Sequence, residues 1–163
     1  MHRRSVLAAG AATLAGCSSL ADEPDAGVAE AAIRDRVNAQ REAADRAPLV
    51  PSETLQTAAV EHSRDMAERD FYAHENPDGQ QPWDRVPCQA GETIHRGVLG
   101  KMQNEGSAKL WRTDQSDDLA GYVAEGWRLS EDHYEIITKR KWTAIGVGVA
   151  IKGDEFFATA MFC

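Results

Sequence analysis

The chain has 163 residues, of which 42% are hydrophobic, and it carries a formal net charge of −8. A chain of this length can form one domain with a sizeable core after an N-terminal leader is set aside. Because the net charge is negative, binding to phosphate backbones is disfavoured, and we expect no nucleic-acid partner.

The first sixteen residues are typical of an export signal. Arg3 and Arg4 precede an apolar run from Val6 to Ala15, and small residues lead up to Cys17. The run is about half of the roughly 20 residues that a membrane-spanning helix needs, so a permanent transmembrane anchor is the weaker interpretation. The arginine pair resembles a twin-arginine signal, and we predict that residues 1–16 direct export.

The residues around Cys17 predict a lipid anchor. Leu14, Ala15, Gly16 and Cys17 together resemble a lipobox, in which the cysteine is lipidated and becomes the mature N-terminus. Residues 17–27 are small and acidic and include proline and glycine, as expected of a tether. One acyl chain binds a bilayer only reversibly, so stable anchoring implies more than one. The sequence thus places the protein on the outer face of the cell membrane.

Two cysteines remain if Cys17 carries lipid. In an exported protein an even pair favours a disulfide, and we predict that Cys88 and Cys163 are bridged. The closed loop is long, so the chain-entropy account gives an upper value of about 4 to 5 kcal/mol for the stabilisation. Two free buried thiols are the alternative.

The first two predicted elements are amphipathic helices. Residues 28–47 place Ile33, Val37 and Ala44 on one face, and Pro48 prevents continuation of this helix. Ser52 is a good N-cap for a second helix that ends after Asp70.

The second helix leads directly to a histidine. One buried face is predicted for it, and His62 on that face is interpreted as a packed histidine. An extended exit then reaches His74, followed by a turn at residues 76–79, where proline and glycine favour reversal. The residues of the predicted buried face are Leu55, Ala58, Ala59, His62 and Met66.

The next segment, residues 86–104, contains several glycines and prolines and shows no sustained periodicity, so no element is predicted there. Ser116 opens a third helix whose buried stripe is Leu119, Val123 and Trp127. Ser130 is a candidate cap for a short fourth helix that carries His133.

The C-terminal residues alternate and predict an antiparallel hairpin. Residues 142–151 place Ile145, Val147 and Val149 on one face, while the other face has only glycine and alanine. Residues 152–154 turn the chain, and residues 155–162 return as the partner strand. Helices followed by such a hairpin indicate an α+β fold in which another part of the chain packs closely on the small-residue face.

Several segments of the chain together carry a resemblance to a known family. They are Asn38, Arg41, HSRDMAERDFYAHENPDG with Arg85, AGETIHRG, GWRLSEDHYEII, WTAIGVGVA and FFATAMFC. In this order and spacing they resemble the CAP superfamily, whose SCP domains include cysteine-rich secretory proteins, venom antigens and plant pathogenesis-related proteins, with many prokaryotic members. The resemblance covers about residues 33–163, and we assign residues 28–163 to one such domain. It implies a three-layer α-β-α sandwich.

The resemblance also implies a cleft lined by His74, Glu92 and His133. The family's Gly-Glu-Asn around the cleft glutamate is here Gly91-Glu92-Thr93, and Glu105 is the alternative glutamate. A second family glutamate is replaced by Ser130, and only Glu125, Glu131 or Glu135 could substitute for it. Two histidines and one glutamate form a ligand set known from catalytic zinc sites.

Three functions are compatible with these residues. The sequence favours a non-catalytic, envelope-anchored module that binds a lipid, another ligand or a protein partner through the cleft of His74, Glu92 and His133. The alternatives are a hydrolase of peptide or wall polymer that depends on zinc or another divalent metal, and a structural envelope domain. No serine lies in a nucleophile-elbow context, which is why binding is preferred over catalysis.

Overall fold

The computed structural model describes residues 23–163, so the predicted export signal and the predicted lipidation site Cys17 lie outside the described residues. None of the helices in the described part combines the length and apolar composition needed to cross a bilayer. The elements in chain order are α1 (Ala26–Ala43), β1 (Val50–Pro51), α2 (Glu53–Arg69), η1 (Pro82–Asp84), β2 (Gly91–Val98), β3 (Lys101–Met102), β4 (Trp111–Arg112), α3 (Ser116–Leu129), α4 (Glu131–Ile137), β5 (Ala144–Lys152) and β6 (Glu155–Phe162).

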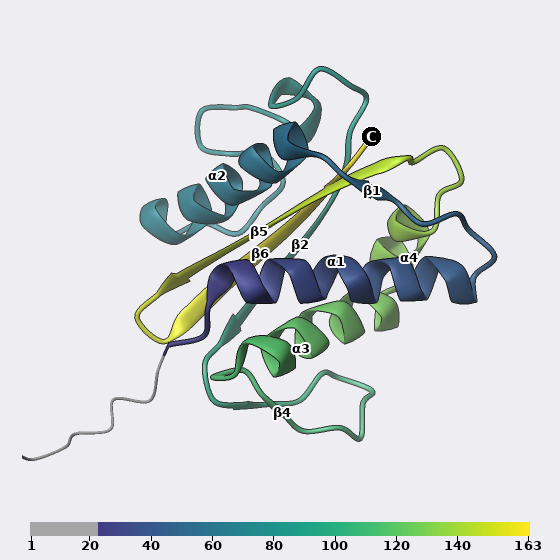
Figure 1. The fold of residues 1–163 in the computed structure, drawn as a ribbon. Coiled ribbons are helices and arrows are strands. Elements are labelled where there is room, and N and C mark those ends of the chain that lie inside the picture. The colour runs from purple at the N-terminus through teal and green to yellow at the C-terminus, as the bar shows by residue number, and fades with distance from the viewer. Residues whose placement is uncertain (1–22) are drawn as a thin grey trace, which may run out of the picture.

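These elements form the predicted three layers (Figure 1). A four-stranded sheet of order β1-β5-β6-β2 lies in the middle, and only the β1–β5 pair is parallel. Helix α2 covers one face of the sheet, while α1, α3 and α4 lie on the other. The α+β sandwich predicted from the sequence is confirmed, as is its C-terminal hairpin of β5 and β6.

Helix α2 packs directly on the small-residue face of β5. A Cβ atom on Gly146 would lie 2.0 Å from the carbonyl carbon of Leu55, and one on Gly148 would lie 2.2 Å from the backbone nitrogen of Val60. The predicted close packing is therefore confirmed, and its partner is the backbone of α2. The bulky residues of β5, among them Ile145 and Val147, point to the opposite face and join the main core.

Helix α1 begins and ends earlier than predicted. Asp25 caps its N-terminus by accepting a hydrogen bond from Val28 N, so the helix includes two residues that the sequence assigned to the tether. The predicted end at residue 47 is wrong. Ala44 caps the helix, and Asp45 has a φ of 56°. The fourth buried residue of the stripe is Arg41 and not the predicted Ala44.

Arg41 links the last turn of α1 to two other segments of the chain. Its side chain is buried and donates hydrogen bonds to Ala47 O at 2.9 Å, Ile137 O at 2.5 Å and Lys139 O at 3.0 Å. All three acceptors are carbonyls, and those of Ile137 and Lys139 lie at the C-terminal end of α4, where the backbone dipoles stabilise a cation. Burial lowers the pKa of Arg41. One arginine thus connects α1 to the segment that leads into β5.

The remaining helices follow the sequence closely. Helix α2 is capped by Ser52, whose side chain accepts from Leu55 N, and it ends at Asp70 in a left-handed conformation. Helices α3 and α4 occupy the predicted segments, and the stripe of Leu119, Val123 and Trp127 is fully buried.

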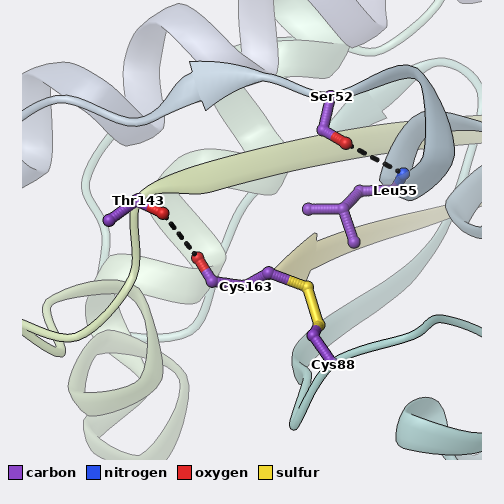
Figure 2. Close-up of a disulfide and its surroundings, with 5 residues drawn as sticks. All are labelled: Ser52, Leu55, Cys88, Thr143 and Cys163. Atoms are coloured by element: carbon purple, nitrogen blue, oxygen red, sulfur yellow. Dashed lines mark hydrogen bonds between the residues drawn. A yellow bond between two sulfur atoms is a disulfide. The ribbon is translucent and has the colours of Figure 1, made fainter.

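The predicted disulfide between Cys88 and Cys163 is confirmed, with Cα atoms 6.1 Å apart (Figure 2). The bridge ties the end of β6 to the segment that precedes β2, and both cysteines pack against the small cluster that contains Leu55. The disulfide therefore fixes the segment between η1 and β2, and this segment connects Arg85 to Glu92.

Strand β2 is the main element that the sequence did not predict. It pairs antiparallel with β6 along its whole length and forms one edge of the sheet. Its side chains do not alternate between apolar and polar, because neither face of this edge strand is a purely apolar core. Polar residues such as Glu92 and Thr93 are buried on it.

The glycine contact makes a direct prediction. Gly148→Ala should lower the free energy of unfolding by about 3 kcal/mol, because the new methyl group meets helix backbone that must shift as a unit. Urea denaturation followed by tryptophan fluorescence measures the effect. Gly27→Ala is the matched control, since its methyl group would meet Asp25 Oδ1 at an ordinary 3.4 Å in α1. Equal stabilities of both variants and the parent would contradict the contact.

Candidate functional site

The candidate site is built around Glu92, which lies near the start of the edge strand β2. Glu92 pairs with Met161 of β6, and its side chain faces the α2 layer, where it is only 1% exposed. A buried carboxylate is costly unless it is paired.

Two side chains pair with the two Glu92 oxygens. Arg85 Nη1 donates to Oε2 at 2.5 Å, and His74 Nδ1 lies 2.8 Å from Oε1. The guanidinium of Arg85 also donates to the His74 carbonyl oxygen, so the same arginine holds both the carboxylate and the histidine backbone. These charge-assisted bonds fix the His74 ring in one orientation, with its Nε2 atom facing away from the carboxylate.

His62 completes the surroundings of Glu92. Its Nε2 atom lies 3.0 Å from Ala73 O and 3.7 Å from Glu92 Oε1. Burial lowers the pKa of His62, and the charge of Glu92 opposes this shift. A neutral ring that donates to Ala73 O therefore fits best. The prediction of a packed histidine agrees with this burial, but the sequence did not indicate that His62 supports the segment of His74.

The approach of His74 to the strand is set by the turn after α2. Asn76 Oδ1 accepts from the backbone nitrogens of Asp78 and Gln80, and Gly79 N donates to Asn76 O. Gly79 has a φ of 82°, which favours glycine. The predicted turn at residues 76–79 is thus confirmed, and it directs the chain back toward β2.

A polar hollow of about 520 Å³ lies between α2 and this turn. Three of its charged groups are paired, since Arg69 bonds both Asp65 and Asp78. These contacts stabilise the turn that carries His74.

His133 lies on the other side of the strand. It lines a hollow of about 440 Å³ together with Tyr72, His95 and Ser130. Burial is the largest cause that lowers the pKa of His133, and the positive charge of a protonated His74 would lower it further. The two histidines are therefore close enough to interact electrostatically. The Tyr72 hydroxyl and Trp127 Nε1 both donate to Ile94 O, at 3.1 and 3.0 Å, and thereby cover the edge of β2 at this point.

A second hollow, of about 410 Å³, adjoins the Glu92 side. It is called the tryptophan hollow below, and it is mostly apolar. Its wall from α4 and the following segment is positively charged. The residues that define it are His74, Pro82, Trp83, Ile136, Lys141 and Trp142.

Two of the three predicted cleft residues, His74 and Glu92, are in direct contact in the structure. The structure joins His74 to Glu92, whereas His133 lines the neighbouring hollow. Within residues 23–163 no three histidine, cysteine, aspartate or glutamate side chains are placed to hold a metal ion. Arg85 adds a positive charge beside the Glu92 oxygens that would face a cation, so Glu92 does not fit the role of a metal ligand. The participation of His133 in the Glu92 site stays a prediction.

The alternative glutamates have other positions. Glu105 is exposed at the rim of the His133 hollow. Glu125 Oε2 accepts from Trp111 Nε1 at 2.8 Å and from Asn104 Nδ2 at 3.1 Å, which is a structural role. Glu131 and Glu135 are exposed on α4. Glu92 is therefore the glutamate that contacts His74.

The comparisons with known proteins agree with this fold. The sequence model of the cysteine-rich secretory protein family, CAP, matches residues 34–163. The chain therefore belongs to the CAP family.

Among the proteins that are similar to this chain are one sequence relative and two solved structures of similar fold. The uncharacterised protein YkwD of Bacillus subtilis is 28% identical over 125 residues, which cover 77% of this chain and 44% of that protein. An extracellular SCP-domain protein of Bacillus anthracis has a TM-score of 0.66 at 24% identity, covering 84% of this chain and 40% of its own. An outer surface protein of Borrelia burgdorferi has a TM-score of 0.68 at 15% identity, covering 86% and 96%. The chain spans less than half the length of the curated relative.

The pairing of Glu92 with Arg85 predicts that removal of the Glu92 charge destabilises the folded protein. Glu92→Gln should lower the free energy of unfolding at pH 7 by about 3 kcal/mol, because the Arg85 guanidinium, only 9% exposed, loses its counter-charge. Urea denaturation measures it. Glu155→Gln is the control, since Glu155 pairs with Arg96, which is 47% exposed, and should cost less than about 1 kcal/mol. Equal losses would show that the Glu92 contacts are no stronger than a surface ion pair.

The burial of His95 predicts that the free energy of unfolding depends on pH. It packs against Tyr122 and Phe156, and burial lowers its pKa from 6.5 to about 4. A histidine with a depressed pKa contributes its full stabilisation above pH 6.5, and this is lost as the pH falls toward 4, because the unfolded chain takes up the proton first.

The expected loss from this one group is about 3 kcal/mol between pH 6.5 and 4, at about 1.4 kcal/mol per pKa unit. His95→Phe keeps an aromatic ring between Tyr122 and Phe156 and removes this part of the pH dependence. Urea denaturation at pH 7 and pH 4 compares the two proteins. Identical losses in both would contradict the buried neutral state of His95.

Proposed function

We propose that this protein is an exported, envelope-anchored CAP-domain module that binds a small ligand through the tryptophan hollow and performs no catalysis. The observation that carries the proposal is the position of this hollow against the paired His74–Glu92 corner. Its volume of about 410 Å³ falls within the range of about 300 to 1,000 Å³ that small-molecule sites occupy. Export and anchoring rest on the Arg3–Arg4 pair and on Cys17.

The paired state of Glu92 supports binding over catalysis. A general base or a metal ligand needs a free lone pair directed at its target. Both Glu92 oxygens are already hydrogen-bonded, to Arg85 and to His74, and the carboxylate is almost completely buried. The carboxylate therefore serves to orient His74. The ring of His74, 45% exposed, presents its other nitrogen to a ligand.

The aromatic wall supports a ligand with an apolar surface. Trp83 is 51% exposed at the mouth of the hollow, although a large apolar side chain gains free energy from burial. A bound ligand that covers the indole would recover that free energy. Trp142 and Ile136 continue the wall from the α4 side.

Native mass spectrometry tests the proposal on the full chain purified from the cells that produce it. The parent protein should retain a bound mass that Trp83→Ala loses. Leu110→Ala is the matched control, because Leu110 is exposed to a similar extent, 57%, and does not line the hollow. The absence of any bound mass in the parent would overturn the proposal. So would a mass of one divalent metal ion that Trp83→Ala keeps and His74→Ala loses.

A further inference from the structure

We propose that the tryptophan hollow takes an anionic sugar, with the sugar ring stacked on Trp83 and its carboxylate paired with Lys141. This inference rests on the proposed function, because it names the ligand class of the same hollow. Three features of the described residues carry it: a free aromatic face, an unpaired cation, and a hydrogen-bond acceptor in a fixed orientation.

Trp83 is held as a rigid, open surface. It lies in the short helix η1 between the buried Pro82 and Asp84, and Asp84 Oδ2 accepts from Gln81 N at 2.8 Å. The backbone under the indole is therefore fixed, so stacking on it costs little conformational entropy.

The Trp83 indole also differs from the other three. Within residues 23–163 its N–H has no hydrogen-bond partner, and its face is half exposed. The other tryptophan N–H groups donate to Glu125, to Ile94 O and to Ile136 O. Both the face and the N–H of Trp83 are available to a ligand.

Positive charge is concentrated at the same hollow. The chain has five lysines and a net charge of −8, yet Lys139 and Lys141 both line this one hollow. Lys139 lies 3.7 Å from Glu135 in an exposed contact. Lys141 forms no ion pair within the described part of the chain, and its ammonium lies 4.2 Å from the ring centroid of Trp142. An anion at the rim would pair with a cation that is otherwise uncompensated.

His74 adds the requirement for a hydroxyl group. In the neutral ring with Nδ1 donating to Glu92, the Nε2 atom is an acceptor on the exposed side of the histidine. A ligand that satisfies all three features has a flat apolar face, a negative charge and hydroxyl donors. A sugar acid has these groups on one ring, whereas a fatty acid has no hydroxyl and a neutral sugar has no charge.

Isothermal titration calorimetry with tetragalacturonate tests the inference, and its fully methyl-esterified form, in which each carboxylate is a neutral methyl ester, is the comparison ligand. The parent protein should bind the acid with a Kd at least about tenfold below that of the ester. Lys141→Gln and Trp83→Ala should each raise the Kd for the acid by about tenfold. Trp83→Phe, which keeps a stacking surface, should restore most of the affinity.

Lys109→Gln is the matched control for Lys141→Gln. It removes an ammonium that lies 3.2 Å from the ring centroid of Trp111, outside the hollow, and it should leave the Kd unchanged. The indole N–H resonance of Trp83 should shift during the titration, while that of Trp111, which donates to Glu125, should not.

Several results would overturn the inference. Equal affinity for the acid and the ester would remove the charge requirement, and an unchanged Kd in Lys141→Gln would remove the assigned cation. Competition by sodium acetate at the tetramer's concentration would reduce the site to a simple anion site. If neither tetramer binds while native mass spectrometry shows a mass that Trp83→Ala loses, the inference fails and the proposed function stands. If no mass is found either, both fail.

Discussion

The close contact between α2 and β5 is the constraint on which the rest of the structure depends. Only glycine at positions 146 and 148 allows helix backbone to reach strand backbone, because any Cβ atom there would overlap the helix. The contact fixes the height of α2 above the sheet, and that height brings His62 and the segment ending at His74 within reach of Glu92 on β2. The geometry around Glu92 therefore depends on how closely α2 packs on β5.

The opposite wall of the tryptophan hollow depends on α1. Arg41 donates to carbonyls at the end of α4, and Asn38 exchanges two hydrogen bonds with the backbone of Leu49. The Arg41 bonds hold the segment that carries Ile136 and Lys141 against α1, and the Asn38 bonds hold the residue that precedes β1. Residues that resemble a family motif in the first helix therefore act through the backbone, at a distance from the tryptophan hollow.

The sequence predicted those elements whose surroundings in the fold give a regular pattern of apolar residues. Helices α2 and α3 have one dry face, so residue spacing alone identified them, and the glycine face of β5 indicated a close neighbour. Strand β2 has no such pattern, because Glu92 and His95 on its two faces adjoin polar or mixed surroundings. The resemblance to the CAP family identified Glu92, which the pattern of residues around it did not.

The sequence by itself determined the helices, the hairpin, the disulfide pair and the acidic charge, because these depend on local periodicity, turn chemistry and composition. Tertiary structure alone decided which side chains meet. It paired Arg85 with Glu92, brought His62 into contact with the backbone of Ala73, and placed Trp83 and Lys141 on the wall of one hollow. These side-chain contacts depend on how the layers pack and on where an edge strand ends. The spacing of residues along one segment predicts neither of these.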